Sequence, residues 1–269
     1  MGERVPVRVV VHGAAGRMGR ANVRAIVEDG GCRLVGAVEH AGSAHLGVDA
    51  GILAGVAPTG VAIVGGLGAL EADVLVDFSR SEASEAIAPL AAERGWALVV
   101  GTTGLEPSAL RALEAAASRV PVVIAPNTSV GVTVLFHLAE LATRLLGDGF
   151  DAEIVEMHHN KKADAPSGTA LRLADVVLTA KGLDRSALRT GREGKPGPRT
   201  RGEVGVLALR GGDVIGDHTL VLAGEGERVE LAHKATDRSL FARGAVRAAK
   251  WTAGRPAGLY DMRDVLGLR

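Results

Sequence analysis

The feature that most constrains this chain is a β-branched run at 5–11 that leads through His12 into a glycine-rich segment at 13–19. Apolar side chains then recur at helical spacing over 17–29, and a second strand-like run follows at 33–38. A strand, a glycine turn, a helix and another strand in this order are typical of a βαβ unit, in which the two strands lie parallel. The start of the chain therefore predicts a parallel sheet.

The same alternation continues along the chain. Further strand-like runs lie at 74–78, 97–100 and 120–124, and segments compatible with helices, such as 81–94 and 106–118, separate them. Strands that alternate with helices predict a parallel sheet covered by helices on both faces. We therefore expect an α/β fold with a Rossmann-type, doubly wound sheet of the kind that binds nucleotides.

The pattern changes after residue 130. Helical segments at 132–146 and about 168–181 flank a strand at 152–157, and the glycine-, proline- and arginine-rich segment 184–203 is typical of a long, solvated loop. Strand-like runs separated by short glycine turns then follow at 203–210, 213–223 and 227–233. Such short spacings suit antiparallel hairpins, so we expect a second, mixed α+β domain.

The last helical segment, 239–253, and the tail behind it are expected to pack back onto the first domain. The predicted division is therefore a dinucleotide-binding domain at 1–129, completed by 239–269, and a second domain at 130–238. The chain has neither a solenoid-type repeat nor a low-complexity tract.

Composition excludes several classes of protein. The 269 residues carry 31 basic and 31 acidic side chains, so no net charge draws the chain to nucleic acid or to an anionic membrane. Aromatic residues are only 3%, which leaves little for a base-stacking surface. Cys32 is the only cysteine, so neither an intrachain disulfide nor a multi-cysteine metal cluster can form. No run of about 18 apolar residues is free of charge, so we expect no membrane span and a cytoplasmic location.

The first candidate site is the glycine-rich turn at 13–19. Its spacing is GxxGxxG, and glycines there allow a tight turn and close approach of backbone amides to a pyrophosphate. Glu39 follows the second strand, where a carboxylate can bind the ribose hydroxyls of a dinucleotide. Glu39 repels a ribose 2′-phosphate and favours NADH, whereas a protonated His40 attracts that phosphate. The alternative is a glycine turn that binds no ligand.

Two further loops follow predicted strands. They are Gly101-Thr102-Thr103-Gly104 and Ala125-Pro126-Asn127-Thr128-Ser129. Ligands of open parallel sheets bind beyond the carboxyl ends of the strands, where both loops are expected. Small side chains and backbone groups there suit a nicotinamide ring and its ribose, although each loop alone is equally compatible with an ordinary turn.

The most informative segment runs from Glu156 to Ala170. It contains His158-His159 and Lys161-Lys162, followed by a helix start at Pro166-Ser167-Gly168-Thr169. A helix start offers amides, hydroxyls and the positive end of the helix dipole, which suit a carboxylate. Histidine is the side chain best suited to proton transfer near neutral pH, and the lysines add positive charge for an anionic substrate. Metal binding is a poorer interpretation, because neither HExxH spacing nor a cysteine cluster is present.

Taken together, these motifs resemble the 4-hydroxy-tetrahydrodipicolinate reductase family, also called dihydrodipicolinate reductase, of bacterial lysine biosynthesis. The resemblance rests on the following segments: Gly13 to Gly19, Asp77-Phe78-Ser79, Gly101 to Gly104, the Asn127 loop, His158 to Ala170, and Gly258 to Leu266. It spans nearly the whole chain in the same order. The His158 block is highly specific for the family.

The resemblance implies a Rossmann-type domain, a mixed α+β substrate domain and a homotetramer whose substrate-domain sheets meet at its centre. It implies that His158 is the proton donor or acceptor, that Lys162 is a proton donor, and that His159, Gly168 and Thr169 contact a small dicarboxylate substrate. NADH or NADPH would bind Gly13, Ala14, Ala15, Gly16, Arg17, Met18, Glu39, Gly101, Thr102, Thr103, Ala125, Pro126, Asn127 and Thr128. In the family an arginine often follows the acidic ribose ligand; His40 stands here instead, which disfavours strong NADPH use.

Two alternatives stay open on the sequence. Another two-domain NAD(P)-dependent reductase, such as a semialdehyde dehydrogenase, needs a nucleophilic cysteine near the nicotinamide, and Cys32 lies at the start of the second strand. A protein that senses NAD(H) without turnover needs the glycine turn but not the His-Lys block.

Overall fold

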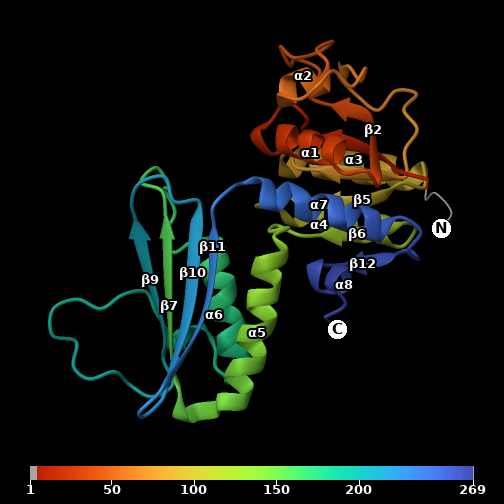
Figure 1. Cartoon of the computed structure of the whole chain (residues 1–269). Coiled ribbons are helices and arrows are strands. Elements are labelled where there is room, and N and C mark those ends of the chain that lie inside the picture. The colour runs from red at the N-terminus through yellow and green to blue at the C-terminus, as the bar shows by residue number, and fades with distance from the viewer. Residues whose placement is uncertain (1–4, 269) are drawn as a thin grey trace. The chain divides into compact units, whose positions relative to one another are not determined.

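The computed structural model describes residues 5–268, which form two compact units. The first unit comprises the chain up to Val130 together with the part from Ser239 onward, and the second comprises Gly131–Arg238. Each unit is described by itself (Figure 1).

The first unit is a seven-stranded parallel sheet with helices on both faces. Its elements, in chain order, are β1 Val7–His12, α1 Arg17–Glu28, β2 Cys32–Val38, α2 Ala50–Ala54, β3 Ile63–Val64, β4 Val74–Asp77, α3 Ser81–Glu93, β5 Ala97–Val100, α4 Pro107–Ala117, β6 Pro121–Ile124, α7 Ser239–Thr252, β12 Gly258–Tyr260 and α8 Met262–Leu266. The strand order is β12-β6-β5-β4-β1-β2-β3, so the chain runs outward in both directions from β1. This is the expected Rossmann-type topology, and it is confirmed.

Apolar residues alternate between the two faces of this sheet and build two cores. One face packs on α1, α2, α7 and α8, and the other packs on α3 and α4 around the buried ring of Trp96. Figure 1 shows α7, in blue, lying along the sheet beside β5 and β6. The side chains are mostly Val, Leu and Ala, and a strand that is buried on both faces needs such a continuous apolar run.

The second unit is a five-stranded mixed sheet with two helices on one face. Its elements are α5 Val130–Leu146, the 3-10 turn Gly147–Gly149, β7 Asp151–His158, α6 Gly168–Ala180, the 3-10 turn Arg185–Ala187, β8 Leu188–Arg189, β9 Val204–Arg210, β10 Gly216–Ala223 and β11 Arg228–Ala235. The inward residues of β7 alternate with outward ones, and Ile154, Leu173 and Leu220 are fully buried between sheet and helices. The expected mixed second sheet is thus confirmed.

The strand order β11-β10-β7-β9-β8 corrects one predicted pairing. β10 and β11 form the expected antiparallel hairpin, but β9 does not pair with β10. β7 lies between them, parallel to β9 and antiparallel to β10. The five residues between Arg210 and Gly216 are long enough to cross one strand, since neighbouring strands lie about 5 Å apart.

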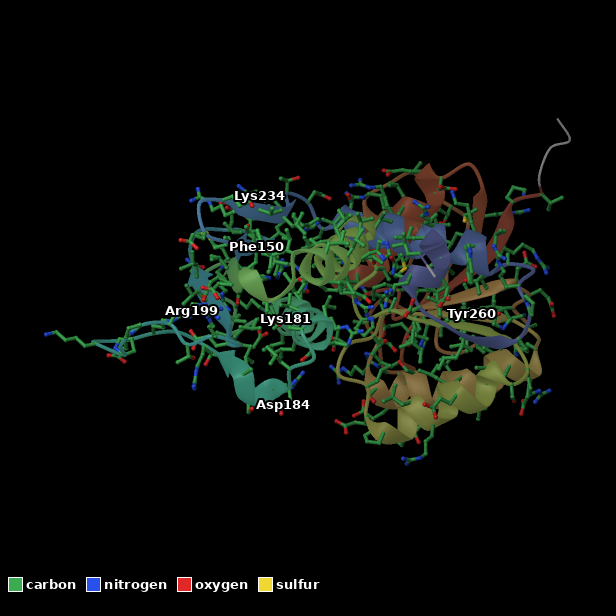
Figure 2. All side chains as sticks on the ribbon, turned by 90° about the horizontal axis from the view of Figure 1, so that it is seen from below. Phe150, Lys181, Asp184, Arg199, Lys234 and Tyr260 are labelled. Atoms are coloured by element: carbon green, nitrogen blue, oxygen red, sulfur yellow. The ribbon has the colours of Figure 1, made fainter. Side chains whose placement is uncertain are left out.

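Segment 184–203 is only partly the solvated loop that its composition predicts. It contains β8, and two of its arginines form ion pairs with the sheet: Arg192 binds Glu153 and Glu203 at 2.7 and 2.6 Å, and Arg199 binds Glu153 at 2.9 Å. Figure 2 shows Arg199 at the base of the loop that projects from the second unit. These pairs anchor both ends of an otherwise exposed loop.

Several short elements were not predicted, namely α2, β3, β8, β12 and α8. The first strand was expected to begin at Val5 but begins at Val7. Val5 is 87% exposed and lies outside the paired part of the sheet. Among the described residues, one helix, Val130–Gly149, is long and apolar enough to cross a membrane. It contains Glu140, Arg144 and Asp148, and a single helix of this kind is weak evidence because helices of soluble cores have the same properties.

Candidate active site

The parallel sheet gathers the predicted cofactor loops at one edge. β1 ends before the glycine turn 13–18, β5 ends before 101–103, and β6 ends before 125–128. Because these strands run parallel, their carboxyl ends lie at the same edge of the sheet. Backbone hydrogen bonds join the start of each of two loops to the end of the neighbouring strand. Gly101 N donates to the carbonyl oxygen of Asp77, and Ala125 N donates to that of Val100, both at 2.8 Å.

The glycine turn has no room for a side chain at Gly13 or at Gly19. Gly13 has φ +75°, and a Cβ on it would lie 2.9 Å from the carbonyl oxygen of Phe78. A Cβ on Gly19 would overlap the carbonyl oxygen of Gly13. α1 then begins after the exposed Gly16, and no side chain of the described residues caps it. Its first amides therefore face outward at the positive end of the helix, an arrangement that fits a pyrophosphate.

Glu39 lies beside this turn, as the sequence predicts. Its carboxylate accepts hydrogen bonds from Ala15 N at 3.0 Å and from His40 N at 3.1 Å. The half-buried carboxylate retains free acceptor positions that suit ribose hydroxyls, whereas a 2′-phosphate would meet its negative charge. The His40 side chain is exposed at the same strand end. The residues present therefore fit a nicotinamide dinucleotide.

A buried carboxylate, Asp77 at the end of β4, links the ends of β1, β4 and β5 to the start of α3. Its oxygens accept hydrogen bonds from four side chains, those of His12, Ser79, Ser84 and Thr102. Burial opposes ionisation, but the bonds from His12 and the hydroxyls outweigh it and lower the pKa of Asp77. Of the two predicted threonine ligands in loop 101–104, Thr102 therefore uses its hydroxyl inside the protein, at 3.0 Å from Asp77, while Thr103 is exposed.

The third predicted cofactor loop, 125–128, is fixed by α7. Thr128 Oγ1 donates to the carbonyl oxygen of Phe241 at 2.7 Å, and Asn127 Oδ1 accepts from Ser129 N at 2.9 Å. Gly244 of α7 contacts the loop so closely that a Cβ there would overlap the carbonyl oxygen of Thr128. The exposed Pro126 is left at the outer surface of the loop.

In the second unit, β7 positions the proton-transferring side chains. Glu156 and His158 alternate with outward residues, so both lie on the inward face near the carboxyl end of the strand. Neither is more than 9% exposed. His158 Nδ1 lies 2.6 Å from Glu156 Oε2, and its ring contacts that of His218 edge to face, with 5.2 Å between ring centres. Burial, together with the charge that His158 carries when protonated, lowers the pKa of His218 to about 4.

Lys162 and His159 lie in the loop between β7 and α6. The Lys162 ammonium donates to both carboxylate oxygens of Asp164, at 2.7 and 2.8 Å, and these bonds lower the pKa of Asp164. The lysine side chain is 20% exposed, so its charged end reaches solvent-accessible space. His159 is half-buried, and its Nδ1 has no hydrogen-bond partner among the described residues.

The start of α6 is capped and open in front of its first residue. Ser167 caps the helix, because its Oγ accepts a hydrogen bond from Ala170 N at 3.2 Å. Gly168 is exposed, and a Cβ on it would meet no atom within 4 Å. Thr169 is half-buried in the same first turn. Open space in front of the first helical residues suits a carboxylate of a ligand. Within residues 5–268, no group of three or more His, Cys, Asp or Glu side chains could hold a metal ion.

Fold and site together define a class of protein: an oxidoreductase that has a Rossmann-type unit for a nicotinamide dinucleotide and a second, mixed unit. Two family models match almost the whole chain: dihydrodipicolinate reductase, N-terminus, over residues 7–128, and dihydrodipicolinate reductase, C-terminus, over residues 131–266. The chain therefore belongs to the dihydrodipicolinate reductase family.

Individual relatives agree with the family models. The chain is 57% identical to a 4-hydroxy-tetrahydrodipicolinate reductase of Anaeromyxobacter sp. (strain Fw109-5), over 98% of each chain. It is 49% identical to one of Myxococcus xanthus (strain DK1622), again over 98% of each chain. Among solved structures, a dipicolinate-bound dihydrodipicolinate reductase from Paenisporosarcina sp. TG-14 matches with a TM-score of 0.76 and 22% identity, covering 96% of this chain and 98% of that one. An amine dehydrogenase from Mycobacterium smegmatis shares the fold at a TM-score of 0.59, with 14% identity and 96% of each chain covered.

The family removes the two alternatives that the sequence left open. Cys32 also argues against a semialdehyde dehydrogenase, because burial raises the pKa of its thiol to about 11. A thiol with such a pKa is protonated near neutral pH and is a poor nucleophile.

The sequence interpretation gave no role to three polar side chains of the two sites: Asp77, Glu156 and Arg210. It left open whether His218 lines the second unit or faces solvent, and the structure buries it beside His158. For Glu156 a signal was available, since it follows Ala152 and Ile154 on the inward face of the strand. For Arg210 no sequence signal was available, because it reaches Glu156 from a neighbouring strand that is distant in the chain.

We predict that His40→Arg raises the affinity for NADPH relative to NADH by about tenfold, the value of one good charge-assisted hydrogen bond. A guanidinium is always charged and binds phosphate oxygens in pairs, which an imidazole ring does not do. Fluorescence titration with each dinucleotide measures the two Kd values. His45→Arg, at an exposed site in the following turn, controls for added charge alone; an equal change in both variants would contradict a local contact at position 40.

Proposed function

We propose that this chain reduces 4-hydroxy-tetrahydrodipicolinate, through dihydrodipicolinate, to tetrahydrodipicolinate, and that His158 and Lys162 handle the protons. The family and its curated relatives support the overall reaction, an NAD(P)H-dependent step of lysine and diaminopimelate biosynthesis. The observation that carries the residue roles is the arrangement at one end of β7, where a paired imidazole, an ammonium and an open helix start belong to one short segment, 158–169.

The chemistry explains why these groups are needed. Loss of water from the hydroxylated ring gives a cyclic conjugated imine with two carboxylates. When bound, the dinucleotide supplies a hydride to one ring carbon, and the negative charge that develops must be protonated. The protein supplies the proton, binds the carboxylates and excludes water.

Each residue has a separate part in this scheme. The first turn of α6 at Gly168 and Thr169, with the Ser167 cap behind it, holds one substrate carboxylate. The His159 ring, which has an unpaired Nδ1, is a further contact for the substrate. Lys162 supplies positive charge and a proton, while His158 exchanges a proton with the substrate from its buried position on β7.

We predict that Lys162→Ala lowers kcat by about 10²- to 10⁴-fold, the usual contribution of a general acid, while NADH binding is unchanged. The assay follows NADH oxidation at 340 nm, with the substrate generated enzymatically in the same cuvette. Lys161→Ala, at the exposed neighbouring lysine, is the matched control. A normal kcat with only a raised KM would reassign Lys162 to carboxylate binding, and no turnover by the unmodified chain would refute the proposed function.

A second prediction concerns the helix start. Gly168→Val places a side chain in the open space in front of α6, so it blocks a carboxylate without disturbing the fold. Pyridine-2,6-dicarboxylate, a planar analogue with both carboxylates, should lose at least about tenfold in affinity, equivalent to one lost charge-assisted hydrogen bond. Titration in the presence of NADH measures this loss, and the Kd for NADH and the melting temperature should stay unchanged. Unaltered binding of the dicarboxylate in the folded variant would rule out this carboxylate site.

We also propose that the chain works as a cytoplasmic homotetramer assembled through its second sheet. The face of this sheet opposite α5 and α6 carries the outward residues Val155, Met157, Leu207, Leu209, Thr219 and Val221. Of these, Leu207 and Leu209 are 38% and 49% exposed in the single chain. Apolar patches of this kind favour association between copies. Sedimentation equilibrium should therefore give four times the chain mass of 27.5 kDa; a monomer mass at micromolar concentration would contradict the proposal.

A further inference from the structure

The side chain of Glu156 is fully buried and surrounded by hydrogen-bond donors. Oε2 accepts from His158 Nδ1 at 2.6 Å and from Arg210 Nη1 at 2.9 Å. Oε1 accepts from Arg210 Nη2 at 3.0 Å and from the backbone amide of Ser167 at 2.9 Å. One carboxylate therefore contacts the ring on β7, the residue that caps α6, and a guanidinium at the end of β9.

Arg210 keeps this carboxylate charged. Burial on its own raises the pKa of Glu156, but the paired bonds from Arg210 and those from His158 and Ser167 outweigh burial and bring the pKa below its ordinary value. Arg210 Nη2 also donates to the carbonyl oxygen of Asp164 at 2.7 Å, within the loop that carries Lys162. The charged pair therefore also holds the backbone of that loop.

An ionised carboxylate accepts hydrogen bonds but donates none. In the neutral ring of His158, the proton must therefore lie on Nδ1, which faces Glu156, and the lone pair lies on Nε2. Nε2 is flanked by Gly216, where a Cβ would come within 3.0 Å of it. The absence of a side chain at Gly216 thus leaves the flank of Nε2 uncrowded.

We propose that Glu156, together with Arg210, is the positioning residue of the reductase: it fixes the His158 tautomer, so that Nε2 exchanges the proton with the substrate, and it ties this ring to the start of α6. The inference rests on the proposed role of His158. The same carboxylate stabilises the imidazolium when Nε2 gains its proton, as acidic partners of histidine do in other enzymes.

The link to α6 sets the spacing between proton transfer and carboxylate binding. Ser167 uses its amide on Glu156, while its hydroxyl oxygen contacts Ala170 N and lies 3.1 Å from His218 Nε2. With its pKa of about 4, His218 is uncharged near neutral pH and adds no competing charge. The first turn of α6 is therefore held at a fixed distance from His158.

Glu156→Gln tests the proposal with minimal change in shape. The four donors around Glu156 are shared between two carboxylate oxygens, and a glutamine side chain offers only one oxygen. Either His158 or Ser167 therefore loses its acceptor in the variant. We expect kcat to fall by about 10²- to 10⁴-fold, as when the acidic partner of a catalytic histidine is replaced by its amide, while the Kd for NADH is unchanged. Glu153→Gln, the same substitution three residues earlier and on the outward face of β7, is the matched control and should keep its activity.

A second readout needs no substrate. Long-range ¹H–¹⁵N spectra of the ¹⁵N-histidine-labelled full chain with NADH report which ring nitrogen carries the proton, and the His158 signals are assigned by their loss in His158→Asn. We expect the Nδ1–H form in the unmodified chain and a gain of the Nε2–H form in Glu156→Gln. Gly216→Ala, which crowds Nε2 but leaves Glu156 in place, should lower kcat and keep the Nδ1–H form.

Two results would overturn the proposal. One is an Nε2–H tautomer of His158 in the unmodified chain, and the other is a kcat of Glu156→Gln within twofold of the kcat of the unmodified chain. If instead the unmodified chain showed the Nδ1–H form but no turnover, the proposed function would fail and the positioning of His158 would stand. The two failures are therefore distinguishable.

Discussion

A carboxylate that is buried away from water must be met by donors or positive charge, and each unit of this chain is organised around one such group. In the first unit Asp77 gathers hydroxyls and an imidazole from the ends of β1, β4 and β5. In the second unit Glu156 gathers an imidazole, a guanidinium and a helix-start amide from β7, β9 and α6. In both cases the donors come from segments far apart in the sequence, so the charge can be buried only when the loops of the site are in place. Each site is therefore part of what holds its unit together.

The two carboxylates differ in what they support. Asp77 receives its hydrogen bonds from small side chains of loops that line the cofactor edge, and it thereby fixes backbone positions. Glu156 contacts a ring that takes part in proton transfer, and a paired arginine keeps it ionised. The first arrangement suits a site that binds through backbone amides, and the second suits a site in which a proton moves.

Local patterns predicted the parts of the fold that are continuous in sequence. The β-branched runs of β1, β2, β4, β5 and β6, the helical spacing of α1 and the glycine turn all appear where expected, because strand and helix periods are local properties. β12 and β3 were missed because each has only two or three residues, too few for a period, and they become strands only by pairing with β6 and β2. The supposed β9–β10 hairpin failed for a related reason, since loop length alone does not reveal that β7 lies between them. Glu156 was visible as an inward polar residue, but its partner Arg210 lies 54 residues away and no short-range pattern connects the two.

α7 has a consequence for how the protein is made. Its residues Ala242, Ala245 and Ala249 are fully buried in the core of the first unit, although they follow the entire second unit in the chain. During synthesis on the ribosome, most strands of the first unit emerge early, but the face of their sheet that packs on α7 stays incompletely covered until this helix is made. The second unit, by contrast, has all its elements once residue 238 has been synthesised. The nascent first unit therefore carries an uncovered apolar surface while Gly131–Arg238 is synthesised, and such a surface favours aggregation. Chains that end before α7 should accumulate as insoluble protein for the same reason, even though every residue of the glycine turn is present.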